Sequence, residues 1–164
     1  MKIGELKNLW APWRKSYIVE PKPEACVFCE KGNANPANDR ENLVLSRKEN
    51  SFVIMNIYPY NAGHLLVAPY VHIAQPEELS REVYHEICDS ILEWKQILEK
   101  SLKAHGLNIG VNLGSAAGAG IAEHLHYHII PRWQGDTNFI TTVADTRVVS
   151  QSLTDLYDKL KLEI

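Results

Sequence analysis

Three histidines alternate with other residues in the stretch EHLHYHIIPR, which covers residues 123–132. On a β-strand, His124, His126 and His128 would project from one face, because successive side chains of a strand point to opposite faces. A neutral imidazole can attack an electrophile, donate a hydrogen bond to a leaving group or bind a metal ion. Histidines that were merely hydrogen-bonded in the core or exposed at the surface would not require this spacing. The spacing therefore predicts a histidine row that does chemistry.

The residues leave two chemical interpretations of this row open. In the first, the three imidazoles hold a catalytic zinc ion that keeps one position for water. In the second, one imidazole is a nucleophile, and its neighbours orient it and stabilise the developing charge. The glycine-rich loop just upstream, NLGSAAGAG at 112–120, favours the second, because its small residues can curl backbone N–H groups around phosphate oxygens. Asn112 and Ser115 add side-chain donors there, and the loop lacks the GK[ST] of a P-loop.

The motif CVFC places Cys26 and Cys29 at the spacing of half a tetrahedral zinc site, whose other two ligands must come from elsewhere. Two cysteines that merely pack apolar surface are one alternative, and a thiol redox pair is another. A redox pair is expected at the start of a helix in a βαβ unit, which this proline-rich segment does not offer. The motif therefore favours a metal clip. The third cysteine, Cys88, is expected to be a buried thiol.

The elements that must position these residues begin with short β-type runs. The runs are LVLS at 43–46, SFVIMN at 51–56, HLLVAP at 64–69, LNIGVNL at 107–113 and LHYHIIPR at 125–132. Each is rich in β-branched, aromatic or leucine residues and is bounded by turn residues. They predict three successive strands that favour antiparallel pairing, and two later strands that flank the glycine-rich loop.

A long helix is predicted between the two groups of strands. Ser80 can cap it, and its apolar residues recur at three- and four-residue spacing. These residues are Val83, Ile87, Ile91, Trp94, Leu98 and Leu102. His105 and Gly106 are expected to end the helix, and TDLYDKLKLEI at 154–164 predicts a short final helix. Strands, a long helix and further strands predict an α+β domain with a mainly antiparallel sheet and the helix on one face.

The composition is that of a soluble globular protein. The 164 residues are 45% hydrophobic and 23% charged, with a formal net charge of -3. This charge gives no general attraction to nucleic acid or an anionic membrane, so a small-molecule partner is expected. No apolar segment approaches the length of a membrane span, which favours a cytoplasmic location.

One domain is expected at this length. Its predicted parts are an irregular N-terminal arm at 1–42 with the metal clip, a core at 43–132 and a C-terminal extension at 133–164. The arm contains aromatic residues that need apolar surroundings, on the domain or on a second subunit. They are Trp10, Trp13, Tyr17 and Phe28.

The stretch HLHYHII fits the His-φ-His-φ-His-φ-φ signature, in which φ is apolar, and so resembles the histidine triad family of nucleotide hydrolases and transferases. Two longer stretches, MNIYPYNAGHLLVAPYVH and GLNIGVNLGSAAGAGIAEH, resemble that family's substrate turn and phosphate loop. LWAPWRKSYI and PRWQGDTNF are most similar to the branch containing bacterial diadenosine tetraphosphate phosphorylases and hydrolases. The resemblance covers nearly the whole chain.

The resemblance implies a role for each site residue in cleaving a nucleoside or dinucleoside polyphosphate at the α-phosphate. His126 would be the nucleophile that forms a nucleotidyl-histidine, and His128 would hydrogen-bond the phosphate and leaving group. His64 would support the site from behind, and Asn56 would contact the ribose. Asn112 and the loop around Gly118 would hold the α-phosphate. Family members often have glutamine or serine where this chain has Gly120, which offers only a backbone N–H.

The resemblance also implies a complete zinc site of Cys26, Cys29, His72 and His124, with a structural role. It implies a homodimer or larger homo-oligomer and no catalytic cofactor. Two other functions stay open. The chain could be a zinc-dependent hydrolase that uses the histidine row as ligands, or a regulatory nucleotide-binding protein with residual activity.

Overall fold

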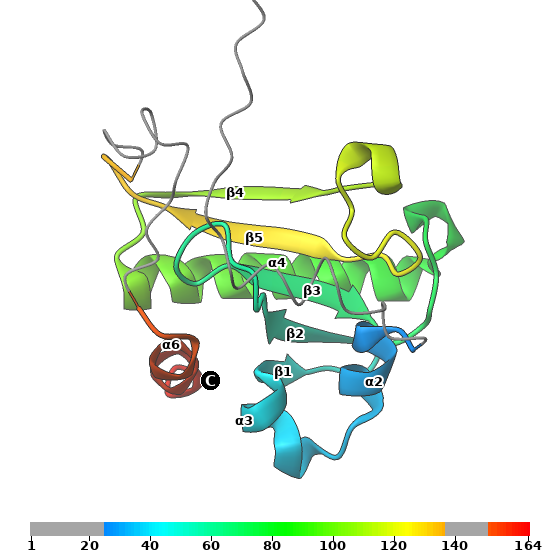
Figure 1. Cartoon of the computed structure of the whole chain (residues 1–164), viewed down its shortest axis with the longest axis horizontal. Helices are drawn as coiled ribbons and strands as arrows, with labels where there is room; N and C mark the ends of the chain where they lie inside the picture. Colours follow the sequence, from blue (N-terminus) through cyan, green and yellow to red (C-terminus); the bar gives the residue numbers. More distant parts are fainter. Residues whose placement is uncertain (1–24, 137–150) are drawn as a thin grey trace, which may run out of the picture.

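The computed structural model describes residues 25–136 and 151–164, and Figure 1 shows how their helices and strands are arranged. Trp10, Trp13 and Tyr17 of the expected arm lie outside the described residues. In chain order the elements are α2 (Val27–Asn33), η1 (Pro36–Asn38), α3 (Asp39–Asn42), β1 (Val44–Arg47), β2 (Ser51–Met55), β3 (Leu65–Pro69), η2 (Pro76–Glu78), α4 (Arg81–Leu102), β4 (Gly106–Val111), η3 (Ser115–Ala117), β5 (Tyr127–Arg132) and α6 (Leu153–Lys161).

The strands form one five-stranded sheet in the order β1-β2-β3-β5-β4, with every neighbouring pair antiparallel. All five predicted strands are present, with small shifts at their ends, and the α+β fold class is confirmed. β5 lies between β3 and β4, so His128 has Leu66 on one side and Gly110 on the other. The C-terminal part of the histidine row is therefore inside the sheet.

The main core lies between the sheet and α4, which runs along one face of the sheet in Figure 1. Alternate strand residues meet the apolar stripe of the helix, and α6 closes the core near β1. The buried side chains include Val53, Met55, Leu65, Val67, Ile129, Ile87, Trp94, Leu98, Leu156 and Leu160. Each large apolar side chain buried in this way stabilises the fold by roughly 1.5–3 kcal/mol.

The long helix begins where the sequence predicts and ends earlier. The Ser80 hydroxyl accepts a hydrogen bond from the Val83 N–H at 3.4 Å, which confirms the cap. The predicted end at His105 and Gly106 is wrong, because Lys103 adopts a left-handed conformation with φ 54° directly after Leu102. A lysine therefore occupies the position where glycine is most common.

The opposite face of the sheet carries a smaller apolar cluster beneath α2. Its buried residues are Phe28, Val44, Phe52, Ile54, Leu66 and Ala68. Residues 27–42 form the three short helical elements α2, η1 and α3, whereas an irregular arm was predicted there. The difference arises from tertiary contacts: the Arg47 guanidinium donates to the carbonyls of Lys31 and Gly32 at the end of α2.

Two further predictions concern the burial of Cys88 and the absence of a membrane-spanning segment. Cys88 is only partly buried, so the prediction of a buried thiol is wrong; it lies beside Ile87 at the edge of the buried stripe of α4. Within residues 25–136 and 151–164, no helix combines the length and hydrophobicity needed to cross a membrane.

Candidate active site and metal centre

The histidine row lies only partly on a strand. β5 begins at Tyr127, so His128 is in the strand, while His124 and His126 precede it. The rings of His126 and His128 are nevertheless adjacent, with centroids 5.1 Å apart. Tyr127 packs on the opposite side, against the main core. The row is buried, with exposed fractions of 1%, 6% and 8% in chain order.

The central histidine has a defined proton position. The Nδ1 of His126 lies 2.8 Å from the backbone oxygen of His124, and a carbonyl oxygen can only accept. The proton of the neutral ring is therefore on Nδ1, and Nε2 has a free lone pair. Burial lowers the pKa of His126, which keeps the imidazole neutral. The Phe28 ring contacts it with centroids 4.9 Å apart. His126 thus has the protonation state of a nucleophile.

His64 lies behind the row and contacts His128. The backbone N–H of Tyr60 donates to His64 Nδ1 at 3.1 Å, so that nitrogen carries a lone pair. The remaining proton is on Nε2, which lies 2.9 Å from His128 Nδ1 and donates to it. His128 must then carry its own proton on Nε2, a buried atom with no partner in the described part of the chain. That N–H is a donor available to a ligand.

Burial is the main cause of the low pKa of both histidines. It lowers the pKa of His64 to about 3, with smaller contributions from the neighbouring His128 and His126. The pKa of His128 falls to about 4, through burial and then through His126. Both imidazoles are therefore neutral at physiological pH, in agreement with the proton positions that the hydrogen bonds require.

The turn before β3 adds two residues to the site. Asn56 lies with its Nδ2 3.3 Å from His64 Nδ1, so the structure brings this predicted residue to the row. Tyr60 was missed by sequence reasoning; its ring centroid lies 4.7 Å from that of His64 and 5.9 Å from that of His128. The available signal was its position in the turn between two predicted site residues. Phe28 was likewise named only as an arm aromatic, although it lies between the two cysteines.

The glycine-rich loop follows directly from β4. Val111 pairs with Tyr127, which brings the start of the loop alongside the histidine row. The loop turns through η3 (Ser115–Ala117), with positive φ angles at Gly114 and Gly118 that side-chain-bearing residues rarely adopt. The N–H of Gly118 donates to the Ser115 oxygen at 3.0 Å. Phosphate contacts by Asn112, Ser115, Gly118 and Gly120 stay a prediction.

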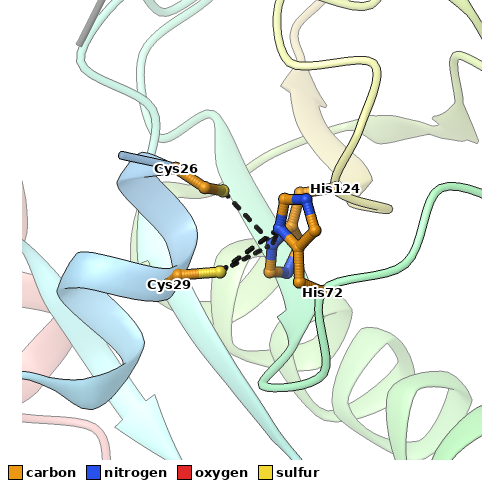
Figure 2. A group of neighbouring side chains, drawn as sticks. All are labelled: Cys26, Cys29, His72 and His124. Atoms are coloured by element: carbon orange, nitrogen blue, oxygen red, sulfur yellow. Dashed lines mark hydrogen bonds between the residues drawn. The ribbon is translucent and has the colours of Figure 1, made fainter. Parts of the chain in front are cut away.

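The four predicted metal ligands converge at one point, as Figure 2 shows. Cys26 directly precedes α2 and Cys29 lies in it, His72 follows β3, and His124 precedes β5. Their ligand atoms all lie within 4.8 Å of one another. The individual distances are 3.3 Å for Cys26 Sγ to His124 Nδ1, 3.3 Å for Cys29 Sγ to His72 Nδ1, 3.5 Å for Cys29 Sγ to His124 Nδ1 and 3.2 Å between the two Nδ1 atoms.

These distances fit a tetrahedral zinc site. Zinc bonds are about 2.0–2.1 Å to nitrogen and about 2.3 Å to sulfur. In a tetrahedron these bonds place two nitrogen ligands about 3.3 Å apart and a nitrogen and a sulfur ligand about 3.5 Å apart. The proton of His124 also fits, because its Nε2 lies 2.9 Å from the Pro69 oxygen and donates to it. This bond leaves the Nδ1 lone pair directed at the cysteines. The group can therefore hold a metal ion.

The chain is similar to known proteins in both sequence and structure. The chain matches the family model described as HIT domain over residues 38–135. It is 36% identical over 157 residues to the protein named AP-4-A phosphorylase from Mycobacterium tuberculosis, which covers 92% of this chain and 80% of that relative. It is 32% identical over 93 residues to the bis(5'-nucleosyl)-tetraphosphatase [asymmetrical] of Schizosaccharomyces pombe, covering 57% and 50%.

A solved structure is similar over a comparable length. The Zn-bound histidine triad family protein from Mycobacterium smegmatis is 27% identical, with a TM-score of 0.67, and the alignment covers 84% of this chain and 91% of that one.

Proposed function

Because the chain belongs to the HIT family, the histidine triad family, we propose that it cleaves dinucleoside polyphosphates such as diadenosine tetraphosphate at the α-phosphate. The reaction would pass through a covalent nucleotidyl-His126. The observation that carries this proposal is the bond from His126 Nδ1 to the His124 oxygen, which leaves the other nitrogen free to attack. The relatives named as a phosphorylase and a tetraphosphatase support the substrate class.

The proposed reaction has two displacements at phosphorus. First, His126 Nε2 forms a bond to the α-phosphorus while the bond to the departing polyphosphate oxygen breaks. His128 stabilises the negative charge there by donating its Nε2–H to a phosphate or leaving-group oxygen. Second, water or inorganic phosphate attacks the phosphorus, and the P–N electron pair returns to His126 Nε2. A proton leaves the attacking water in the hydrolytic case.

The acceptor of the second step decides the product. Water would release AMP, and inorganic phosphate would release ADP, with ATP leaving in the first step in both cases. We propose that Asn112, Ser115 and the backbone around Gly118 and Gly120 hold the phosphate oxygens, because their loop begins beside the histidine row. A backbone N–H at Gly120 leaves more space for an acceptor than a side chain would.

We also propose that Cys26, Cys29, His72 and His124 hold zinc with a structural role. Zinc bound there would supply a rigid link between α2 and the start of the histidine row. The proton positions argue against the alternative in which the row itself binds zinc: His124 directs its lone pair at the cysteines, and His128 has no lone pair to offer, because its Nδ1 accepts from His64 and its Nε2 carries the proton. The likeness to a Zn-bound family member supports the metal's identity.

We propose a homodimer that forms at the outer strand of the described sheet. Among the described residues β4 is the last strand, and the side chain of Ile109 on it is 46% exposed. Tyr84 and Leu92 on α4 are also exposed apolar residues, at 44% and 57%. Exposed strand edges with apolar neighbours are sites where a second chain can pair. The size of the oligomer, the cytoplasmic location and the division into arm, core and extension stay predictions.

The direct test is an incubation with diadenosine tetraphosphate, with and without inorganic phosphate, followed by chromatography of the products. Wild type is expected to give ATP plus AMP as a hydrolase, or ATP plus ADP only with phosphate as a phosphorylase. His126→Ala is expected to lose turnover. His85→Ala, which removes an exposed histidine from α4, is the control that should retain it. No products from wild type, or equal turnover by His126→Ala, would refute the proposal.

A further inference from the structure

We infer that Asn56 is a positioning residue whose side-chain amide, together with the Tyr60 N–H, determines which nitrogen of His128 carries the proton. This inference rests on the proposed function, because it concerns the donor that His128 presents to the substrate. The amide orientation follows from the turn: Asn56 Oδ1 accepts a hydrogen bond from the Tyr58 N–H at 2.9 Å. The other end of the amide, Nδ2, is then directed at His64 Nδ1, 3.3 Å away.

Two donors therefore converge on one nitrogen of His64. The side-chain N–H of Asn56 and the backbone N–H of Tyr60 both point at Nδ1. Neither group can accept a hydrogen bond, so Nδ1 must be the acceptor. The ring is 1% exposed, and burial disfavours a charged imidazolium there. His64 is thereby held as the neutral tautomer with its proton on Nε2.

The tautomer of His64 is passed on to His128. The 2.9 Å contact between His64 Nε2 and His128 Nδ1 needs one proton, which His64 supplies. His128 Nδ1 must accept, so its own proton is on Nε2. That atom is buried without a partner in the described residues, on a side chain that is 8% exposed, so its N–H is presented to whatever binds. Phosphate oxygens accept hydrogen bonds and cannot donate them when ionised, so this tautomer suits them.

This role differs from the ribose contact that the family resemblance implies for Asn56. Both ends of the amide are already engaged, with Tyr58 and with His64. A ribose contact would chiefly affect substrate affinity, and a carboxylate could still accept from ribose hydroxyls. An amide that sets the tautomer would instead affect kcat. Replacing its N–H with an acceptor would move the proton of His64 to Nδ1 and that of His128 to Nδ1.

The test uses Asn56→Asp and imidazole ¹⁵N NMR of the ligand-free, full-length protein. In wild type, His64 and His128 are expected to be protonated on Nε2 only. In Asn56→Asp, the introduced carboxylate is expected to draw the proton to His64 Nδ1, and His128 should then show Nδ1–H and an unprotonated Nε2. Wild-type His128 protonated on Nδ1, or a variant in which His128 keeps Nε2–H, would overturn the inference.

Kinetics give an independent readout. Asn56→Asp is expected to lower kcat on diadenosine tetraphosphate by roughly 10²-fold, the scale of one general-acid contribution, with KM nearly unchanged. Asn108→Asp is the matched control, because Asn108 lies on β4, its Oδ1 already accepts from Arg132 on β5, and β5 separates it from β3. A raised KM with unchanged kcat would favour the ribose contact and overturn the inference. If wild type shows no turnover at all, the proposed function fails, while the NMR result still decides the tautomer.

Discussion

Backbone groups help to set the proton positions of three imidazoles of the site, His124, His126 and His64, while that of His128 is set by His64. The Pro69 carbonyl accepts from His124, and the His124 carbonyl accepts from His126. The Tyr60 N–H donates to His64, which has the opposite effect on the ring and places the proton on Nε2. Because all these rings are buried, each is neutral in the free protein, which suits the proposed roles of metal ligand, nucleophile and hydrogen-bond relay.

The low pKa values of His64 and His128 predict a pH dependence of stability. Both are neutral in the folded and unfolded chain above the ordinary histidine value of about 6.5. As the pH falls below that value, the unfolded chain takes up protons that the folded chain refuses, so stability decreases. The decrease continues to about pH 4 for His128 and about pH 3 for His64. Each histidine contributes a slope of up to roughly 1.4 kcal/mol per pH unit in its window.

Urea unfolding between pH 7.5 and 5 measures this dependence. His64→Gln keeps an acceptor and a donor at that position and removes one titrating ring, so its stability should fall less steeply with decreasing pH than that of wild type. Other groups titrate in both proteins and cancel in the comparison. Parallel curves for wild type and the variant would show that the pKa of His64 is not depressed in the folded state.

At the scale of elements, α2 is held in place by a strand residue. Arg47 at the end of β1 donates to both carboxylate oxygens of Asp39 and to the carbonyls of Lys31 and Gly32. The side chains of this ion pair are only 17% and 16% exposed. The guanidinium therefore satisfies the last carbonyls of a short helix, which would have little stability alone. This helix carries Phe28 and Cys29 and begins directly after Cys26.

Arg47→Met is expected to lower the free energy of unfolding by roughly 2–4 kcal/mol, because it leaves a buried carboxylate and two helix-end carbonyls unpaired. Urea denaturation measures the loss. Arg47→Met combined with Asp39→Asn should recover part of it. Arg40→Met is the matched control, since the ion pair of Arg40 with Asp158 is exposed and its loss should change stability little. Equal effects of the Arg47 and Arg40 substitutions would contradict this account.

The sequence is informative about elements whose stability is local. Strand alternation and the apolar stripe of α4 predict the sheet and the helix, because these patterns are the ones that bury one face. The short helix α2 could not be predicted, since its end depends on Arg47, sixteen residues away from the Lys31 carbonyl that it satisfies. The left-handed conformation of Lys103 could not be predicted either, because Gly106 is the stronger sequence signal for the end of a helix.

In the candidate site too, features set by local sequence could be predicted and features set by distant contacts could not. The alternate spacing indicates His124, His126 and His128 as candidate site residues, and CVFC indicates two of the proposed metal ligands, because both motifs are local in sequence. His72 could be added only through a family resemblance, since nothing near it signals a ligand. The part played by Tyr60 depends on its backbone N–H, and no residue type encodes that position.

At the scale of the whole molecule, the proposed zinc would join segments that are distant along the chain. Cys26 and His124 are separated by 98 residues, and their ligand atoms lie 3.3 Å apart. A cross-link that closes so long a loop removes much of the freedom of the unfolded chain. Here it would also fix α2 over the histidine row, where Phe28 contacts the His126 ring. We expect the metal to act on stability more than on chemistry.

Metal analysis should find one zinc per chain, and removal by a chelator should lower Tm by roughly 10 °C, as expected for a cross-link of this loop length. Below that Tm, the metal-depleted protein should still form the covalent intermediate. Cys26→Ser should behave like the depleted protein, and Cys88→Ser, which changes a cysteine outside the cluster, should bind zinc normally. Immediate loss of activity on chelation with Tm unchanged would favour zinc bound by the histidine row.

The central claim is that His126 becomes covalently attached to the nucleotide. The most direct measurement is rapid quenching of wild type during turnover of diadenosine tetraphosphate, under alkaline conditions that preserve a phosphoramidate, followed by intact and peptide mass spectrometry. The account predicts one adenylate on His126, none in His126→Ala, and an unchanged adduct in His85→Ala. An adenylate on another residue, or turnover at the full rate by His126→Ala, would contradict it.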